Sequence, residues 1–249
     1  MLKVLWTRFK QGHRTMEYPA GPAPELPRRF LGRPKLDASL CMVGCPGCSS
    51  VCPTGALGGG KLDLGKCIFC GACAAACPEQ AVEFTREYRM AARRREDLVA
   101  QGDGYRLAEA LEAKSRQLFG RSLKLRQVSA GGCNACEADV NVLNTIGWDL
   151  GRFGVQFVAS PRHADGLLVT GPVSENMRPA LLKTWEAVPS PKLVIAVGSC
   201  AIAGGPYRGH PEAHDGCGKF LPVDLFIPGC PPHPLTTLDG ILRLLGRIG

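Results

Sequence analysis

Residues 67–78 read CIFCGACAAACP, and this stretch decides the fold of the front half of the chain. It places Cys67, Cys70, Cys73 and Cys77 at a two-two-three spacing and ends in Pro78. In this pattern three close thiolates bind one [4Fe-4S] cubane, and the fourth cysteine reaches a second cluster. The small residues between the cysteines let backbone N–H groups approach the sulfurs. The stretch therefore predicts half of a two-cluster iron–sulfur domain.

The partner stretch, CMVGCPGCSSVCP, covers residues 41–53 and has one extra residue between its first two cysteines. In such domains the fourth cysteine of each stretch binds the cluster of the other stretch. This exchange assigns Cys41, Cys45, Cys48 and Cys77 to one cluster, and Cys67, Cys70, Cys73 and Cys52 to the other. The extra residue leaves open that Cys41 is displaced, which would make its site labile or three-iron. Eight closely spaced cysteines can also form a cross-braced zinc module, so a zinc-stabilised assembly module is a distant alternative.

Composition divides the 249-residue chain around these cysteines. Residues 1–37 are rich in Pro, Arg and Gly, which predicts an extended N-terminal arm. Residues 38–85 form the predicted α+β two-cluster domain, of the bacterial ferredoxin type. Residues 86–122 are rich in Ala, Arg, Glu and Leu, which predicts a linker of helices broken near Gly102 and Gly104.

In residues 123–249, short apolar runs alternate with helical patterns. Strands are expected at 123–128, 155–159, 166–170, 193–197 and 224–227, and helices near 136–147, 175–187 and 234–247. This alternation predicts an α/β domain with a small, flavodoxin-like, doubly wound parallel sheet. Ligands of such sheets bind at the carboxyl ends of the strands. Cysteines follow three of these ends, and we expect Cys133, Cys136, Cys200 and Cys230 to converge there on one further cubane.

The back half resembles the small, electron-transfer subunit of nickel–iron hydrogenases, especially those of the formate hydrogenlyase and energy-converting type. The resemblance rests on the motifs GGCNACE, SPRHAD, Gly-Ser-Cys and IPGCPP. Respiratory complex I has a related subunit family. The front half resembles the polyferredoxin-type subunit of the same complexes. The resemblance implies an oxidoreductase subunit with three [4Fe-4S] clusters, of which Cys133, Cys136, Cys200 and Cys230 hold the proximal one. The nickel–iron site would lie in a partner large subunit, so no catalytic residue is expected in this chain.

The resemblance leaves a second function open, electron transfer in a complex I-like quinone or ferredoxin oxidoreductase without hydrogenase activity. It also names three possible modulators of the proximal cluster. Glu137 follows the cysteine pair and is either a proton-moving carboxylate or an ordinary first-turn residue that the helix dipole favours. Arg162 and His163, from SPRHAD, are either charges beside the cluster or structural residues.

Charge and hydropathy bear on partners and location. The formal net charge is +8, but twelve thiolates around three cubanes would add about −6, so nucleic acid is not an expected partner. The N-terminal sequence has no signal-peptide core, and the Arg28-Arg29 pair is not followed by an apolar segment. We expect a cytoplasmic protein at the inner face of the membrane, joined to it only through hydrogenase, iron–sulfur or membrane partner subunits.

Overall fold

Five parallel strands build the sheet of the back half, in the order β10-β9-β8-β6-β7. The structure is a computed structural model that describes residues 2–12, 14–41, 45, 47–100, 104–119 and 122–249. The strands are β6 (Leu123–Ser129), β7 (Val155–Phe157), β8 (Gly166–Thr170), β9 (Leu193–Val197) and β10 (Leu225–Ile227). Strand order reverses at β6, because β7 lies on one side of it and β8 on the other. Such a reversal opens a crevice at the carboxyl ends of the strands.

Helices cover both faces of this sheet. They are α5 (Ala135–Val142), α6 (Arg178–Ala187), α7 (Ser199–Ala203) and α8 (Pro234–Leu244). Successive strand residues face opposite sides, so Leu168 and Ile195 join the core beneath α5 and α8, whereas Leu167 and Val194 join the core beneath α6. The prediction of a doubly wound parallel sheet is confirmed.

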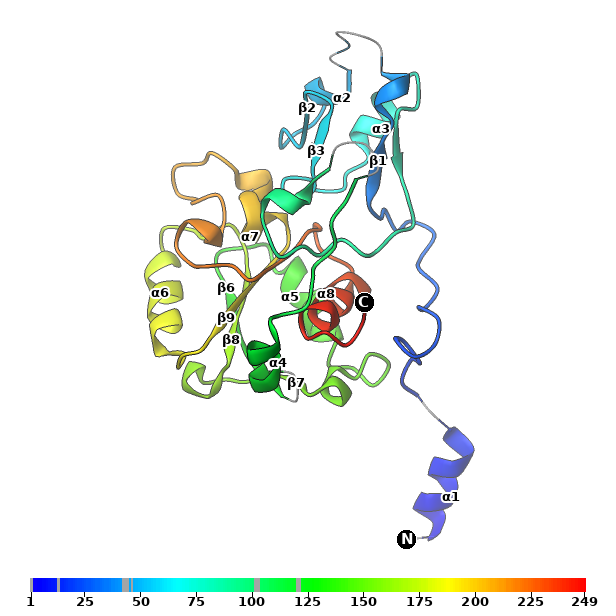
Figure 1. The fold of residues 1–249 in the computed structure, drawn as a ribbon, viewed down its shortest axis with the longest axis vertical. Helices are drawn as coiled ribbons and strands as arrows, with labels where there is room; N and C mark the ends of the chain where they lie inside the picture. The colour runs from blue at the N-terminus through cyan, green and yellow to red at the C-terminus, as the bar shows by residue number, and fades with distance from the viewer. Residues whose placement is uncertain (1, 13, 42–44, 46, 101–103, 120–121) are drawn as a thin grey trace.

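The front half contains two small antiparallel sheets. One pairs β1 (Pro34–Leu36) with β4 (Val82–Phe84), and the other has the order β2 (Leu57–Gly58), β3 (Lys61–Asp63), β5 (Val99–Ala100). Two short helices, α2 (Gly47–Ser50) and α3 (Ala72–Ala76), pack together beside them. Figure 1 shows this half above the sheet, close to α7. Leu62 and Leu64 share one hydrophobic core with Val128 of β6, so the two halves are joined by packing as well as by the chain.

The linker and the arm differ from expectation. In the described part of residues 86–112 the helical structure is a single 3-10 turn at Glu96–Leu98, and an α-helix, α4, covers Ala113–Phe119. The prediction of linker helices is therefore wrong outside α4; Gly102, one of the two predicted breaks, lies outside the described residues. Backbone bonds between Ala92 and Phe226 explain the extended course, because this segment pairs with the edge strand β10.

The arm begins with a helix, α1 (Leu2–Gln11), which the prediction of a wholly extended arm misses. Pro19 lies in a turn at residues 18–21, and from Pro22 the chain runs without helix or strand as far as β1, with Ala23 and Leu26 packed against the core of the back half. Tyr18 donates a 2.9 Å hydrogen bond to the buried Asp239, which is also paired with Arg243 at 2.9 Å. Other 3-10 turns are at Ala38–Leu40, Leu150–Phe153, Pro161–His163, Gly205–Tyr207 and Cys217–Lys219. No helix in the described ranges is long and apolar enough to cross a bilayer.

Candidate iron–sulfur centres

The first four-cysteine set lies in the front half, where Cys41, Cys45, Cys48 and Cys77 line one small cavity. Burial raises the pKa of the Cys48 thiol, and charges on Cys41, Cys77 and Cys45 raise it further, which places all four side chains close together. They are the four cysteines that the exchanged pattern assigns to one cluster. Cys41 lies at the cavity despite the extra residue in the stretch 42–44, which is outside the described residues.

The second set joins Cys67, Cys70 and Cys73 to Cys52. Burial raises the pKa of Cys67 to about 12, and charges on Cys73, Cys52 and Cys70 add to this. Cys52 behaves differently: burial would raise its pKa, but backbone N–H groups of residues 54, 56 and 57 outweigh burial and lower it. The structure therefore brings together the second set of four in the same crossed arrangement.

The third set lies at the carboxyl ends of the parallel strands. Cys133 follows β6, Cys136 is in the first turn of α5, Cys200 is in α7 and Cys230 follows β10. Burial raises the pKa of Cys136, and charges on Cys200, on Glu137 and on Cys230 and Cys133 raise it further. Cys133 and Cys230 are exposed whereas Cys200 is buried, so this set opens to the surface on one side.

Backbone N–H groups point at several of the sulfurs. The donor–sulfur distances are 3.4 Å for Gly47 to Cys45, 3.2 Å for Ala56 to Cys52, 3.4 Å for Phe69 to Cys67 and 3.3 Å for Ala81 to Cys77. Such bonds stabilise negative charge on the sulfur, and they help to set the potential of a bound cluster. Both front sets therefore have the environment that thiolate ligands need.

Glycine makes room for the third set. Gly198 has a φ of +90°, and a Cβ at this position would lie 2.6 Å from Sγ of Cys136. A Cβ at Gly205 would lie 2.7 Å from Sγ of Cys200. Both distances are shorter than real contacts allow, so these glycines are required for the approach of the backbone to the sulfurs.

The second and third sets adjoin each other. A charge on Cys70 is among the causes that raise the pKa of Cys230, after burial and Cys133. The hydroxyl of Ser199, beside Cys200, donates to the backbone oxygen of Cys67 at 2.5 Å and to that of Gly229 at 3.0 Å. Ser199 is not among the predicted site residues, although it lies inside the Gly-Ser-Cys element. It ties the loops of the two sets directly together.

The donor chemistry fits iron–sulfur cubanes. Each set offers four soft thiolates, which iron in a sulfide cluster prefers. Within the described ranges, no three His, Cys, Asp or Glu side chains stand close enough to bind a single metal ion. A cubane takes its thiolates at four separate irons, so its ligands are more widely spaced than those of one ion.

Glu137 is buried and hydrogen-bonded beside the third set. It is 6% exposed, and its Oε1 accepts a 2.5 Å hydrogen bond from the hydroxyl of Thr170. Burial would raise the pKa of Glu137, but hydrogen bonds from Ser129 and Thr170 outweigh it, and the pKa is lowered overall. The side chain is therefore a fixed negative charge near Cys136 and Cys200 at neutral pH.

Replacing Glu137 with glutamine is expected to raise the reduction potential of a cluster at the third set. The loss of one nearby negative charge favours the added electron by on the order of 50–100 mV. A redox titration followed by electron paramagnetic resonance measures the shift. Glu186→Gln, on the exposed side of α6, is the control and is expected to leave the potential unchanged; equal potentials for both variants would contradict the assigned charge effect.

The structure does not bring Arg162 and His163 to the third set. Both lie in the 3-10 turn that precedes β8, where Asp165 donates its N–H to the carbonyl of Lys124 at the amino half of the sheet. The cysteines instead follow the carboxyl ends of the parallel strands. The two side chains therefore lie away from the third set, which they were expected to modulate, because β8 separates them from it.

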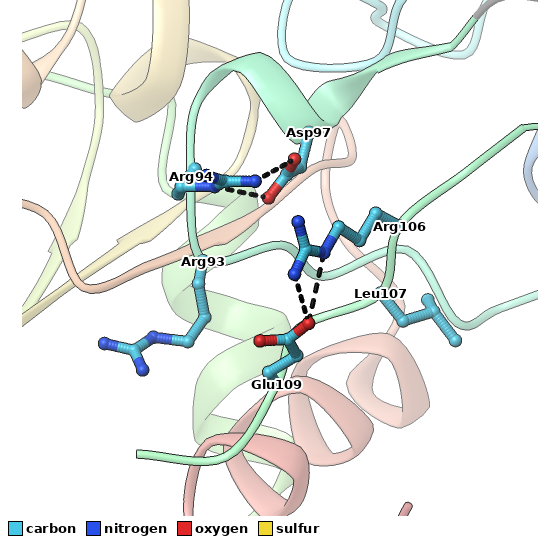
Figure 2. A pocket seen from close by; sticks show the side chains of 6 residues that line it. All are labelled: Arg93, Arg94, Asp97, Arg106, Leu107 and Glu109. Carbon is cyan, nitrogen blue, oxygen red and sulfur yellow. Dashed lines mark hydrogen bonds and ion pairs between the residues drawn. The ribbon is translucent and has the colours of Figure 1, made fainter. Parts of the chain in front are cut away.

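An open pocket elsewhere offers no such chemistry. Figure 2 shows it lined by Arg93 and by two satisfied ion pairs, Arg94 with Asp97 and Arg106 with Glu109. It is lined by no cysteine, and its three arginines and two carboxylates leave a net charge of +1, which does not suit a cationic metal ion. The three cysteine sets are therefore the candidate centres.

Comparisons with known proteins give two family matches. Residues 133–244 match the family described as the NADH ubiquinone oxidoreductase, 20 Kd subunit, and residues 61–83 match a 4Fe-4S binding domain. The first range contains the third set, and the second contains Cys67, Cys70, Cys73 and Cys77. The chain therefore combines a 4Fe-4S binding domain match with a match to the 20 Kd subunit family.

Three relatives have similar sequences. Formate hydrogenlyase subunit 7 of Escherichia coli is 40% identical over 139 residues, 56% of this chain and 54% of that protein. The probable membrane-bound hydrogenase subunit mbhJ of Pyrococcus furiosus is 40% identical, over 55% of this chain and 84% of the relative. An NADH-quinone oxidoreductase subunit of Clostridium beijerinckii is 42% identical, over 47% of this chain and 70% of the relative. The chain thus spans about half the length of the first relative and most of the other two.

Proposed function

Because this chain belongs to the family of the NADH ubiquinone oxidoreductase 20 Kd subunit, we propose that it is the iron–sulfur electron-transfer subunit of an oxidoreductase complex. The single observation that carries the proposal is the gathering of twelve cysteines into three sets of four, of which the second and third adjoin. The thirteenth, Cys217, is fully buried apart from them.

Three [4Fe-4S] clusters are the proposed cofactors. Cys41, Cys45, Cys48 and Cys77 would hold the first cluster, Cys67, Cys70, Cys73 and Cys52 the second, and Cys133, Cys136, Cys200 and Cys230 the third. When bound, each cubane accepts and passes on single electrons. The protein fixes the thiolates, donates N–H groups to sulfur and excludes water from the buried sides.

The order of the relay follows from contacts between the sets. The charge interaction of Cys70 with Cys230, and the bonds of Ser199 to Cys67 and Gly229, make the second set the neighbour of the third. Cys41 and Cys45 of the first set are exposed, so the first set is the proposed entry or exit for a redox partner. The second set connects it to the third.

The partner at the third set is proposed to be a large subunit that carries a nickel–iron site, in a hydrogenase held at the inner face of the membrane. Two features support this. Cys133 and Cys230 are exposed, so a partner can approach the third set closely, and two of the relatives are named as subunits of formate hydrogenlyase and of a membrane-bound hydrogenase.

A second candidate keeps the relay but changes the complex. The Clostridium beijerinckii relative is named as part of an NADH-quinone oxidoreductase, which favours a complex I-like quinone or ferredoxin oxidoreductase without hydrogenase activity. The companion large subunit separates the two candidates: nickel bound through paired CxxC motifs supports the hydrogenase, and their absence supports the second candidate.

Iron and zinc content, measured with the electron paramagnetic resonance spectrum of anaerobically purified, dithionite-reduced protein, tests the relay. We expect about twelve irons per chain, because there are three sets of four cysteines, and signals from interacting cubanes, because the second and third sets adjoin. About eight irons would implicate the Cys41 site. Stoichiometric zinc with a silent spectrum would overturn the relay and support the assembly module.

A further inference from the structure

Helix α1 stands apart from the rest of the molecule in Figure 1. None of its ten residues is buried. The aromatic contacts that it makes are internal, with Trp6 stacked on Phe9 at 6.1 Å and Lys10 over Trp6 at 5.2 Å. The chain joins the back half at Met16, whose N–H donates to the carbonyl of Gly147 at 2.9 Å. The helix is therefore tethered to the body but does not pack on it.

One face of α1 is apolar. Leu2, Leu5, Trp6 and Phe9 follow the i, i+3, i+4, i+7 spacing that places side chains on one side of a helix. Their exposed fractions run from 59% for Trp6 to 84% for Leu2. An isolated helix of this length is marginal in water, because packing of the apolar face supplies most of the stability of a short helix. The face therefore requires an apolar environment outside this chain.

Basic residues border that face. At 100° per residue, Lys3 and Lys10 lie on one flank and Arg8 on the other. Arg14 follows, and residues 2–16 contain no aspartate or glutamate. An apolar face with Trp and Phe, flanked by Lys and Arg, is the pattern of a helix that lies in a lipid interface. Anionic head groups complement such flanks, whereas a protein groove does not require one sign of charge on both sides.

We propose that α1 binds an anionic lipid surface directly, with Leu2, Leu5, Trp6 and Phe9 inserted and the basic flanks on the head groups. The chain then carries its own membrane contact in addition to those of its partners. This goes beyond the proposed relay, since it involves no cysteine and no cluster.

Flotation of the full, anaerobically purified chain with lipid vesicles tests this. We expect the chain to float with phosphatidylcholine vesicles that contain about a third phosphatidylglycerol, and several-fold less with pure phosphatidylcholine. Leu5→Asp is expected to lower vesicle binding about tenfold, because it places a charge in the inserted face. Val4→Asp is the matched control: Val4 is also exposed and its substitution changes the charge equally, but it lies on the opposite face. We expect it to lower binding about twofold.

Either of two results would overturn the proposal. Failure of the full chain to bind anionic vesicles would mean that the apolar face serves a protein groove. Equal losses in Leu5→Asp and Val4→Asp would mean that only general charge attraction holds the chain. Iron content is expected to be the same in both variants, so failure here is distinguishable from failure of the relay.

Discussion

Replacing Cys136 with alanine is expected to lower the iron content from about twelve to about eight per chain, because a cubane at the third set loses a ligand. The remaining three thiols are held by separate segments: the loop after β6, helix α7 and the loop after β10. Three such ligands do not retain a four-iron cluster well at a surface that is open on one side. Electron delivery to the partner subunit should then fail, while the signals of the front clusters persist. Iron analysis and electron paramagnetic resonance of the reduced protein measure both effects.

Cys217→Ala is the matched control for this variant. Cys217 is fully buried, and burial raises its pKa to about 12, but no cysteine charge contributes to that rise. Its loss should cost only about 1 kcal/mol of stability through a small cavity and leave the iron content at about twelve. An unchanged iron content in Cys136→Ala, or an equal loss in Cys217→Ala, would contradict the assignment of the third set.

Adding one methyl group at Gly198 is expected to have nearly the same effect as removing a ligand. The Cβ of Gly198→Ala would lie 2.6 Å from Sγ of Cys136, and the φ of +90° adds strain of about 1–3 kcal/mol. The sulfur must move, because Gly198 is fixed by its N–H bond to the carbonyl of Ile227 at 2.9 Å. We expect loss of about four irons and a lower unfolding temperature, measured by iron analysis and thermal denaturation.

Gly209→Ala separates strain from displacement of the sulfur. Gly209 also has a left-handed φ, +75°, but a Cβ there meets nothing within 4 Å. This control should lose stability without losing iron. Gly198→Ala could instead keep its full iron content and lose only as much stability as Gly209→Ala. That result would mean that backbone strain, and not contact with Cys136, requires glycine at position 198.

The architecture of the back half was predictable because its strands are apolar and regularly spaced. The predicted strands at 166–170 and 193–197 coincide with β8 and β9. The arm and the linker were predicted less well. An extended arm was predicted because of its prolines, which begin at Pro19. Residues before them have helical spacing of apolar side chains, at Leu2, Leu5, Trp6 and Phe9, and form α1. In the linker, helix-favouring composition is overridden by pairing of Ala92 with the edge of the sheet.

The sequence by itself determined which cysteines group into the proposed ligand sets, because local spacing sets how three cysteines can wrap around one cluster and strand order sets which loops share an edge. It could not determine how the sets lie relative to one another. Only the tertiary structure decided that Cys70 lies near Cys230, that Ser199 bonds to Cys67, and that Arg162 and His163 lie at the other half of the sheet. The first two relations join residues more than a hundred positions apart, and the third concerns the connection that precedes β8. Packing of the shared core fixes all of them, and no local sequence pattern encodes that packing.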